Sequence, residues 1–271
     1  VAREILQYAS TISEAVAIAS KRKMFVSESF LIASAQDHKA VIIEKTPSTL
    51  DVYESGQNEL ICTNHYQSQS LGDSKLNQEQ KQNSASVYRY ERLNELLTSV
   101  HINSPSQTAA ILRDYRGKGN QDIGLGNEKA LNQFIAHHSI IFEPERLLAW
   151  VSTSPWQEGE YRCYDLKKIF AHPAESWTHE LDEVSLRIPA DPFIQTKEFA
   201  QFKQYRQLRN AYRDHTPILP MQVIQCNPHL YDAYRLAGDV YRQLHQNDSA
   251  RWAYKQALQL EVATLNERHA L

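Results

Sequence analysis

The chain has 271 residues, of which 42% are hydrophobic and 23% are charged, and its formal net charge is −3. These proportions are those of a globular protein with enough chain for a sizeable core, and the charge balance argues against nucleic acid or an anionic membrane surface as a partner. No apolar run reaches the length of a membrane span, and three widely spaced cysteines do not make a disulfide framework.

The first part of the chain is predicted to form two short helices followed by an antiparallel sheet. The second helix should begin at Thr11, because Glu14 stands at the spacing of a capping box. Four segments have the pattern of strands: 25–34, 39–44, 49–54 and 59–63. Their short connections favour antiparallel pairing in one sheet.

A polar segment, residues 67–86, follows the fourth predicted strand. It contains only Leu71 and Leu76 as large apolar residues, so it lacks the means to bury itself. We expect an irregular, mobile surface loop here, which could serve as a flap over a site.

Helices, a loop and strands are predicted in the middle of the chain. One helix should begin at Ser86 and another after Ser104, where Pro105 and Gln107 supply a start signal and a capping box. The glycine-rich stretch 117–126 lacks the lysine of a phosphate-binding loop and is predicted to be a flexible loop. Three more strands (139–142, 147–152 and 161–164) and a long helix (192–212) are expected after it.

The last part of the chain has the spacing of one tetratricopeptide repeat, a helix–turn–helix unit of about 34 residues. The matching positions are Tyr231, Tyr234, Ala237, Gly238, Tyr241, Ala250, Tyr254 and Ala257. We expect Gly238 and Ala250 to meet where two antiparallel helices cross, with Tyr234 and Tyr254 buried beside them. A single repeat leaves one of its faces uncovered. We therefore expect residues 231–264 mainly to pack on the preceding helix, with binding of a protein partner as the less favoured interpretation.

The segment 59–66 carries the first candidate chemistry. Cys62 and His65 lie three residues apart, but no second pair of Cys or His completes a zinc site, so no metal is expected. Cys62 could act as a nucleophile with His65 as its base, although a cysteine at the end of an apolar strand more often packs as a small hydrophobe. Asn64 could cap a turn, or it could provide a fixed hydrogen-bond donor at a sheet edge.

Two arginines follow on the predicted helix. Arg89 lies near its start, and Arg92 lies one turn later on a similar face. An asparagine can stabilise an oxyanion, and a buried arginine can hold a carboxylate or orient a nucleophile. No Gly-x-Ser-x-Gly elbow accompanies them, so the set lacks a nucleophile.

Four motifs occur in a fixed order along residues 1–170. They are the hairpin Ala35–Glu44, the signature Cys62–Tyr66, the helix start Ser86–Tyr90, and the strand pair His138–Pro144 with Leu148–Val151. Together they resemble the acyl-coenzyme A:6-aminopenicillanic acid acyltransferase family, autoproteolytic N-terminal-nucleophile hydrolases related to choloylglycine hydrolases and acid ceramidase. The tail lies outside the common core and looks like an appendage of some bacterial members.

The resemblance implies roles for particular residues. Asn64 would take the oxyanion-hole position and Arg89 that of the active-site arginine, while Arg92 is its rival and is expected, with Tyr66, to contact the substrate. The family's nucleophile is a cysteine exposed as residue 1 by self-cleavage, with its own α-amino group as the base. Position 1 here is Val1. The chain is therefore expected to be the downstream part of such an enzyme, inactive alone, with the nucleophile on an upstream segment of the same precursor.

These features together predict an α+β fold. Residues 1–190 are expected to form part of a four-layer αββα sandwich and residues 191–271 a helical extension. The expected activity is hydrolysis or acyl transfer at a linear amide of a small molecule, through a cysteine acyl-enzyme and without a cofactor. The alternative is a non-catalytic binding module, or an inactive relative, whose tail docks a protein partner. The acyl group, the acceptor and the compartment are left open.

Overall fold

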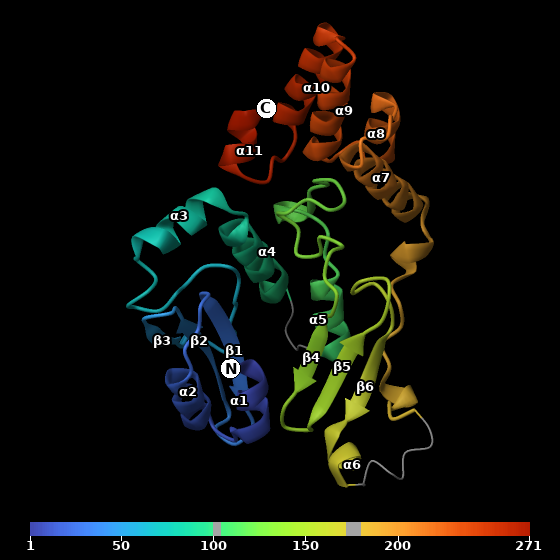
Figure 1. Ribbon diagram of the computed structural model, residues 1–271. Coiled ribbons are helices and arrows are strands. Elements are labelled where there is room, and N and C mark those ends of the chain that lie inside the picture. The colour runs from blue at the N-terminus through green and yellow to red at the C-terminus, as the bar shows by residue number, and fades with distance from the viewer. Residues whose placement is uncertain (100–103, 172–179) are drawn as a thin grey trace. The chain divides into compact units, whose positions relative to one another are not determined.

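The computed structural model describes residues 1–99, 104–171 and 180–271, which fall into two compact units. The first unit comprises Val1–Tyr90 with the turn Glu143–Leu147, and the second comprises Glu91–Phe142 with Leu148–Leu271. Each unit is described by itself, with the element labels of Figure 1. Both contain helices and a small antiparallel sheet, so the predicted α+β class is confirmed.

The first unit begins with two helices that pack on a three-stranded antiparallel sheet (Figure 1). The elements are α1 (Ala2–Tyr8), α2 (Ile12–Lys21), β1 (Glu28–Ser34), β2 (Lys39–Lys45) and β3 (Leu50–Tyr53), in the sheet order β1-β2-β3. The predicted capping box is present, because the side chains of Thr11 and Glu14 bond to each other's backbone N–H groups. Ala15 and Ala19 of α2 pack against Val41 of the central strand, and all three are fully buried.

The fourth predicted strand, residues 59–63, is wrong, since the backbone is irregular there. The carbonyl of Ile61 accepts a hydrogen bond from Gln67 Nε2 at 2.7 Å. The side chain of Gln67 therefore satisfies the Ile61 carbonyl, which in a β-sheet would have accepted a hydrogen bond from a neighbouring strand.

The predicted irregular loop at 67–86 is also wrong, because helix α3 (Lys75–Asn83) lies inside it. Ser74 caps this helix by accepting from the backbone N–H of Asn77 at 3.4 Å. Its sequence is rich in Lys, Gln and Glu, which are good helix formers without being apolar. The flap hypothesis, which required an irregular segment, is therefore dropped.

The second unit contains the other sheet and a helix beside it. The sheet has the order β4 (Ile140–Glu143), β5 (Leu148–Ser152) and β6 (Tyr161–Asp165). Helix α5 (Pro105–Leu112) begins at the predicted capping box of Ser104 and Gln107, and its Ala109 packs with Trp150 and Cys163 of the sheet. Helix α4 (Ser86–Thr98) runs across the boundary between the two units.

The remainder of the second unit is helical. Its elements are η1 (Lys118–Asn120), α6 (Leu166–Ala171), η3 (Val184–Leu186), η4 (Pro192–Gln195), α7 (Lys197–Arg213), α8 (Pro220–Cys226), α9 (Tyr231–Gln243), α10 (Asn247–Gln259) and α11 (Leu265–Ala270). An aromatic core holds α7 in place, in which Phe199 and Phe202 contact Phe134 with ring centroids 6.2 and 4.9 Å apart. Burial of several aromatic rings makes this the largest core of the unit.

The predicted helix pair in the tail is present as α9 and α10, whereas the expected meeting of Gly238 and Ala250 stays a prediction. Gly238 faces the ring of Tyr254, where a Cβ would stand only 2.6 Å from the ring carbon Cε1. Ala250 is buried, but Tyr234 and Tyr254 are half-buried rather than buried. The helix pair is thus observed, whereas its identity as a tetratricopeptide repeat stays a prediction.

The glycine-rich stretch 117–126, predicted to be a flexible loop, contains the short helix η1 and is held by contacts with a later part of the chain. Leu125 exchanges two hydrogen bonds with the side chain of Asn227, at 3.2 and 2.8 Å. Gly124 has a φ of 80° and lies so close to the backbone of Leu230 that a side chain would not fit.

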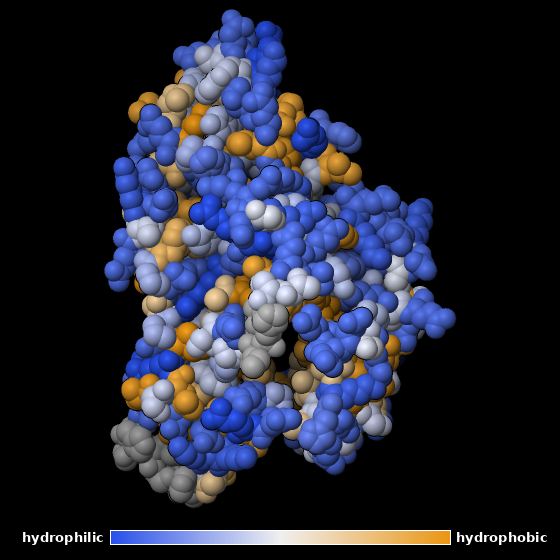
Figure 2. All heavy atoms as spheres, turned by 180° about the vertical axis from the view of Figure 1, so that it is seen from behind, coloured by the Kyte–Doolittle hydropathy of each residue, from blue (hydrophilic) through white to orange (hydrophobic). Residues whose placement is uncertain are grey.

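The surface is mostly hydrophilic on the face shown in Figure 2, with smaller hydrophobic patches between polar regions. Among residues 1–99, 104–171 and 180–271, no helix is both long enough and apolar enough to cross a membrane.

Candidate active site

The segment Cys62–Tyr66 is fixed by hydrogen bonds from the polar stretch that follows it. The backbone N–H of Tyr66 donates to Asn77 Oδ1 at 2.8 Å, and Asn77 Nδ2 donates back to the carbonyl of Tyr66 at 3.0 Å. Asn77 is buried and also donates to the carbonyl of Gly72 at 2.7 Å. One amide side chain of α3 thus holds both backbone groups of the last residue in the segment.

A buried carboxylate fastens the next two residues to the sheet. Glu44 of β2 is fully buried, and its two oxygens accept from the backbone N–H groups of Gln67 at 2.7 Å and Ser68 at 3.0 Å. A buried carboxylate needs such charge-assisted partners, because leaving it unpaired in the interior is costly. The C-terminal end of the signature segment is therefore anchored twice, by Asn77 at Tyr66 and by Glu44 at Gln67 and Ser68.

Asn64 and Arg89 lie in direct contact. Arg89 Nη2 donates to Asn64 Oδ1 at 2.6 Å, across 25 residues of sequence. Because the amide oxygen accepts this bond, the amino end of the Asn64 side chain points away from the guanidinium and can donate to another group. A charged donor on the oxygen also polarises the amide and strengthens its N–H groups as donors.

His65 makes a triangle of polar contacts with two hydroxyl groups. Its Nδ1 lies 2.9 Å from Ser86 Oγ and 3.1 Å from Thr63 Oγ1, and the two hydroxyl oxygens are 3.1 Å apart. The ring also lies against Tyr90, with centroids 5.7 Å apart. Burial, together with the nearby charges of Lys81 and Arg89, lowers the pKa of His65. The imidazole is thereby kept neutral at neutral pH.

A cavity of about 1000 Å³ lies beside the signature segment within the first unit. It is lined by the segment itself, the start of β1, the turn between β2 and β3, and parts of the chain from Leu71 to Gln80. Asn64, His65 and Tyr66 all line it. If residues 59–63 were a strand, His65 would lie on the face opposite Asn64 and point away from this cavity; that prediction is wrong, because His65 lines it. The alternation of faces that supported it requires a strand, and the segment is irregular.

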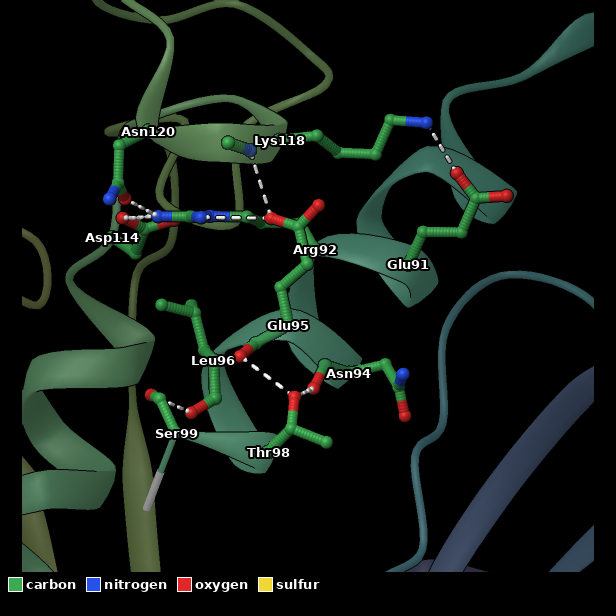
Figure 3. Close-up of polar contacts among 11 residues, drawn as sticks. Glu91, Arg92, Asn94, Glu95, Leu96, Thr98, Ser99, Asp114, Lys118 and Asn120 are labelled. Atoms are coloured by element: carbon green, nitrogen blue, oxygen red, sulfur yellow. Dashed lines mark hydrogen bonds and ion pairs between the residues drawn. The ribbon is translucent and has the colours of Figure 1, made fainter.

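Arg92 has a different environment, shown in Figure 3. Its guanidinium donates to Asp114 at 2.9 and 3.0 Å, to Glu95 at 3.0 Å and to Asn120 at 2.7 Å, with only 4% of the side chain exposed. The hydrogen bonds to Asp114 are the main cause that raises the pKa of Arg92. These contacts are those of a buried ion pair that stabilises the fold, so the predicted role of Arg92 in substrate binding stays a prediction.

The three cysteines are all withdrawn from solvent to some degree. Burial, with a smaller effect from the charge of Glu44, raises the pKa of Cys62 to about 11. Cys163 and Cys226 are buried. A thiol with so high a pKa carries little thiolate at neutral pH, which disfavours Cys62 as a nucleophile. In the described part of the chain, no group of three or more His, Cys, Asp or Glu residues could hold a metal ion.

Comparison with protein families shows to which family the chain belongs. The AAT family, described as acyl-coenzyme A:6-aminopenicillanic acid acyl-transferase, matches residues 1–152, more than half of the 271 residues. The chain belongs to this family. No curated protein and no solved structure matches it. Membership in the AAT family implies the N-terminal-nucleophile fold and an acyltransferase or amidase relative acting on an acyl substrate. The match ends at the last residue of β5, before the helical tail.

Several residues of the site were missed from sequence alone. Asn77 belongs to a segment predicted to be irregular, although Ser74 followed by a run of helix formers was a usable signal. Thr63 and Ser86 lie within the motifs Cys62–Tyr66 and Ser86–Tyr90, but the sequence alone assigned neither of them a role in the site. Their contact spans 23 residues, and a separation of that kind leaves no periodic signal.

Proposed function

We propose that the chain carries the oxyanion-stabilising part of a cysteine N-terminal-nucleophile amidase or acyltransferase, acting on a linear amide of a small molecule. The observation that carries the proposal is the 2.6 Å hydrogen bond from Arg89 to the amide oxygen of Asn64, a residue that lines the cavity. Membership in the AAT family supports this chemistry.

In this proposal, the amino group of Asn64 stabilises the oxyanion. A thiolate attacks the amide carbonyl carbon, and as the C–S bond forms an electron pair moves to the carbonyl oxygen. A donor about 3 Å from that oxygen stabilises the charge as it develops. Collapse of the intermediate breaks the C–N bond, and the leaving nitrogen takes the proton that the base removed from the thiol, so a neutral amine departs. The acyl group stays on sulfur until water or another acceptor takes it.

Arg89 is proposed to orient and polarise Asn64 rather than to contact the leaving group. Its charged N–H group holds the amide oxygen, so the amino group is turned toward the substrate. Tyr66 lines the same cavity and is proposed to contact the substrate beside Asn64. Burial is the main cause that raises the pKa of Tyr66, so its ring contacts substrate as a neutral group.

The nucleophile is proposed to be a cysteine on another segment of the same precursor, with its own α-amino group as the base. The high pKa of Cys62 and the burial of Cys163 and Cys226 favour this over a nucleophile within these residues. Residues 1–152 would then form their part of the αββα sandwich of the N-terminal-nucleophile fold.

The test is Asn64→Ala in the full-length protein that contains this chain, assayed with acyl p-nitroanilides of different chain lengths. We expect turnover to fall roughly a hundredfold or more, the usual effect of losing one oxyanion donor. Mass spectrometry should still detect the acyl-enzyme, formed at a lower rate. Asn58→Ala is the matched control, because Asn58 is exposed at a bend outside the signature segment, and its substitution should leave turnover unchanged.

Two results would refute the proposal. Unchanged turnover in Asn64→Ala would remove Asn64 from the chemistry. A wild-type protein that never forms an acyl-enzyme with any substrate of the panel would favour the alternative, a binding module or inactive relative whose tail docks a protein partner.

A further inference from the structure

Thr63 and His65 are the two sequence neighbours of Asn64, and both contact one hydroxyl group of α4. Ser86 Oγ lies 2.9 Å from His65 Nδ1 and 3.1 Å from Thr63 Oγ1. Ser86 is the first residue of α4, and Arg89 follows it on the same helix by one turn. The two ends of the Asn64–Arg89 hydrogen bond are therefore tied together a second time, by contacts on either side of Asn64.

Thr63, His65 and Ser86 interact through hydrogen bonds between neutral groups, not through an ion pair. Ser86 is fully buried and His65 is half-buried. The burial that lowers the pKa of His65 keeps the imidazole neutral beside the cationic Arg89. Tyr90, which lies against the ring, and Lys81, whose charge also lowers the pKa of His65, are titratable groups near it. These hydrogen bonds are part-buried and favour one geometry, because breaking them leaves the buried Ser86 hydroxyl without a partner away from water.

Asn64 itself is exposed and depends on such support. Among the residues that the structure describes, its side chain makes one hydrogen bond, to Arg89, and Asn64 lies on an irregular segment rather than on a strand. An oxyanion donor works only when it is held close to the position of the developing charge, and a displacement of about 1 Å can cost up to a hundredfold in rate.

We propose that Thr63, His65 and Ser86 form a positioning bracket that sets the backbone of Asn64 at a fixed distance from Arg89. The three residues act through Asn64 and do not touch the reacting atoms. The proposal rests on the proposed function of Asn64 as the oxyanion donor, and it assigns His65 a structural hydrogen bond rather than a role as general base.

The experiment compares substitutions that keep the hydrogen bond with others that remove it, in the full-length protein with the same anilides. His65→Leu removes Nδ1, whereas His65→Asn places an amide group near the position of Nδ1. We expect His65→Leu to lower kcat roughly ten- to hundredfold with little change in KM. His65→Asn should recover most of the loss, which a general base would not allow. His269→Leu, at an exposed position of α11, is the control and should leave kcat unchanged.

A second pair of variants covers the case in which His65→Leu does not fold. Thr63→Val keeps the shape of the side chain and removes its hydroxyl group, while Thr63→Ser keeps the hydroxyl. The valine variant should lower kcat and the serine variant should not. Circular dichroism and thermal unfolding should be measured for each variant, so that kcat is compared only among folded proteins.

Combination with Asn64→Ala decides whether the bracket acts through Asn64. In that background, Thr63→Val or His65→Leu should lower kcat by less than about twofold, because the group they position is gone. The same large loss in both backgrounds would overturn the bracket, and so would an unchanged kcat in both single variants. If Asn64→Ala alone has no effect, the proposed function fails instead, so the two failures are distinguishable.

Discussion

Arg89 and Arg92 lie one turn apart on α4, yet the structure gives them different surroundings. Arg92 has 4% of its side chain exposed and is bound by two carboxylates and an amide, from Asp114, Glu95 and Asn120. Arg89 is half-buried and donates to the amide of Asn64, a residue on a cavity wall. Spacing along a helix therefore does not distinguish an arginine that stabilises the fold from one that approaches a candidate catalytic group. The two kinds of arginine are distinguished by the groups that each side chain contacts.

Removal of the Arg92 guanidinium should give the largest effect on stability. Arg92→Met leaves Asp114, 13% exposed, without its cation, and we expect a loss of roughly 3–5 kcal/mol in the free energy of unfolding. Urea denaturation measures this loss directly. Arg251→Met, at a side chain that is 69% exposed, should change stability by less than about 0.5 kcal/mol. Equal effects of the two substitutions would remove the contrast between structural and exposed arginines.

Substitution of Arg89 should act mainly on turnover. Arg89→Met removes the charged donor from the amide oxygen of Asn64, so we expect kcat to fall roughly a hundredfold, comparable to the loss of Asn64 itself. Arg89→Lys keeps the charge but loses the planar geometry, and it should recover only part of the activity. If Arg92→Met lowered kcat more than Arg89→Met in folded protein, the assignment of the two arginines would be reversed.

The buried glutamates Glu44 and Glu158 also differ in their hydrogen-bond partners, and this difference leads to a predicted pH dependence of stability. Glu44 has two backbone N–H partners, whereas Glu158 accepts from Asn132 and its Oε2 has no hydrogen-bond partner among the described residues. Burial, followed by the charge of Asp191, raises the pKa of Glu158 to about 7 from an ordinary value of 4.5. The folded state therefore binds a proton that the unfolded state has already released between these values.

Stability should consequently fall as the pH rises from about 4.5 to about 7, by up to roughly 3 kcal/mol from this one group. Glu158→Gln carries no charge at any pH and should flatten that part of the profile. The measurement is urea unfolding of both proteins across this range. A wild-type profile that rises in this window, with no difference from Glu158→Gln, would contradict the assignment.

Local signals in the sequence predicted the helix starts and the hairpin strands. The capping boxes at Thr11 and Ser104 involve groups three residues apart, so spacing alone reveals them. The order of the motifs likewise indicated the family, and the pattern of helices and strands indicated the α+β class.

Features that depend on distant polar partners could not be predicted in the same way. The segment 59–63 has the apolar residues of a strand, but Gln67 satisfies its backbone and no strand forms. Helix α3 is anchored by the amide of Asn77 instead of an apolar face, so a prediction based on apolar content missed it. The buried environment of Arg92 depends on Asp114, which lies 22 residues beyond it in the sequence.

The course of α4 through both units has a consequence for dissecting the protein. A fragment that ended at the unit boundary would retain only Ser86–Tyr90 of this helix, five residues. A helix of about one turn is unstable without tertiary packing, because the conformational entropy lost in nucleating it exceeds the free energy gained from its few hydrogen bonds. The residues that carry Ser86 and Arg89 would then lose their helical frame, although every one of them was still present. The unit that holds the candidate site is compact in space but is not an autonomous piece of chain.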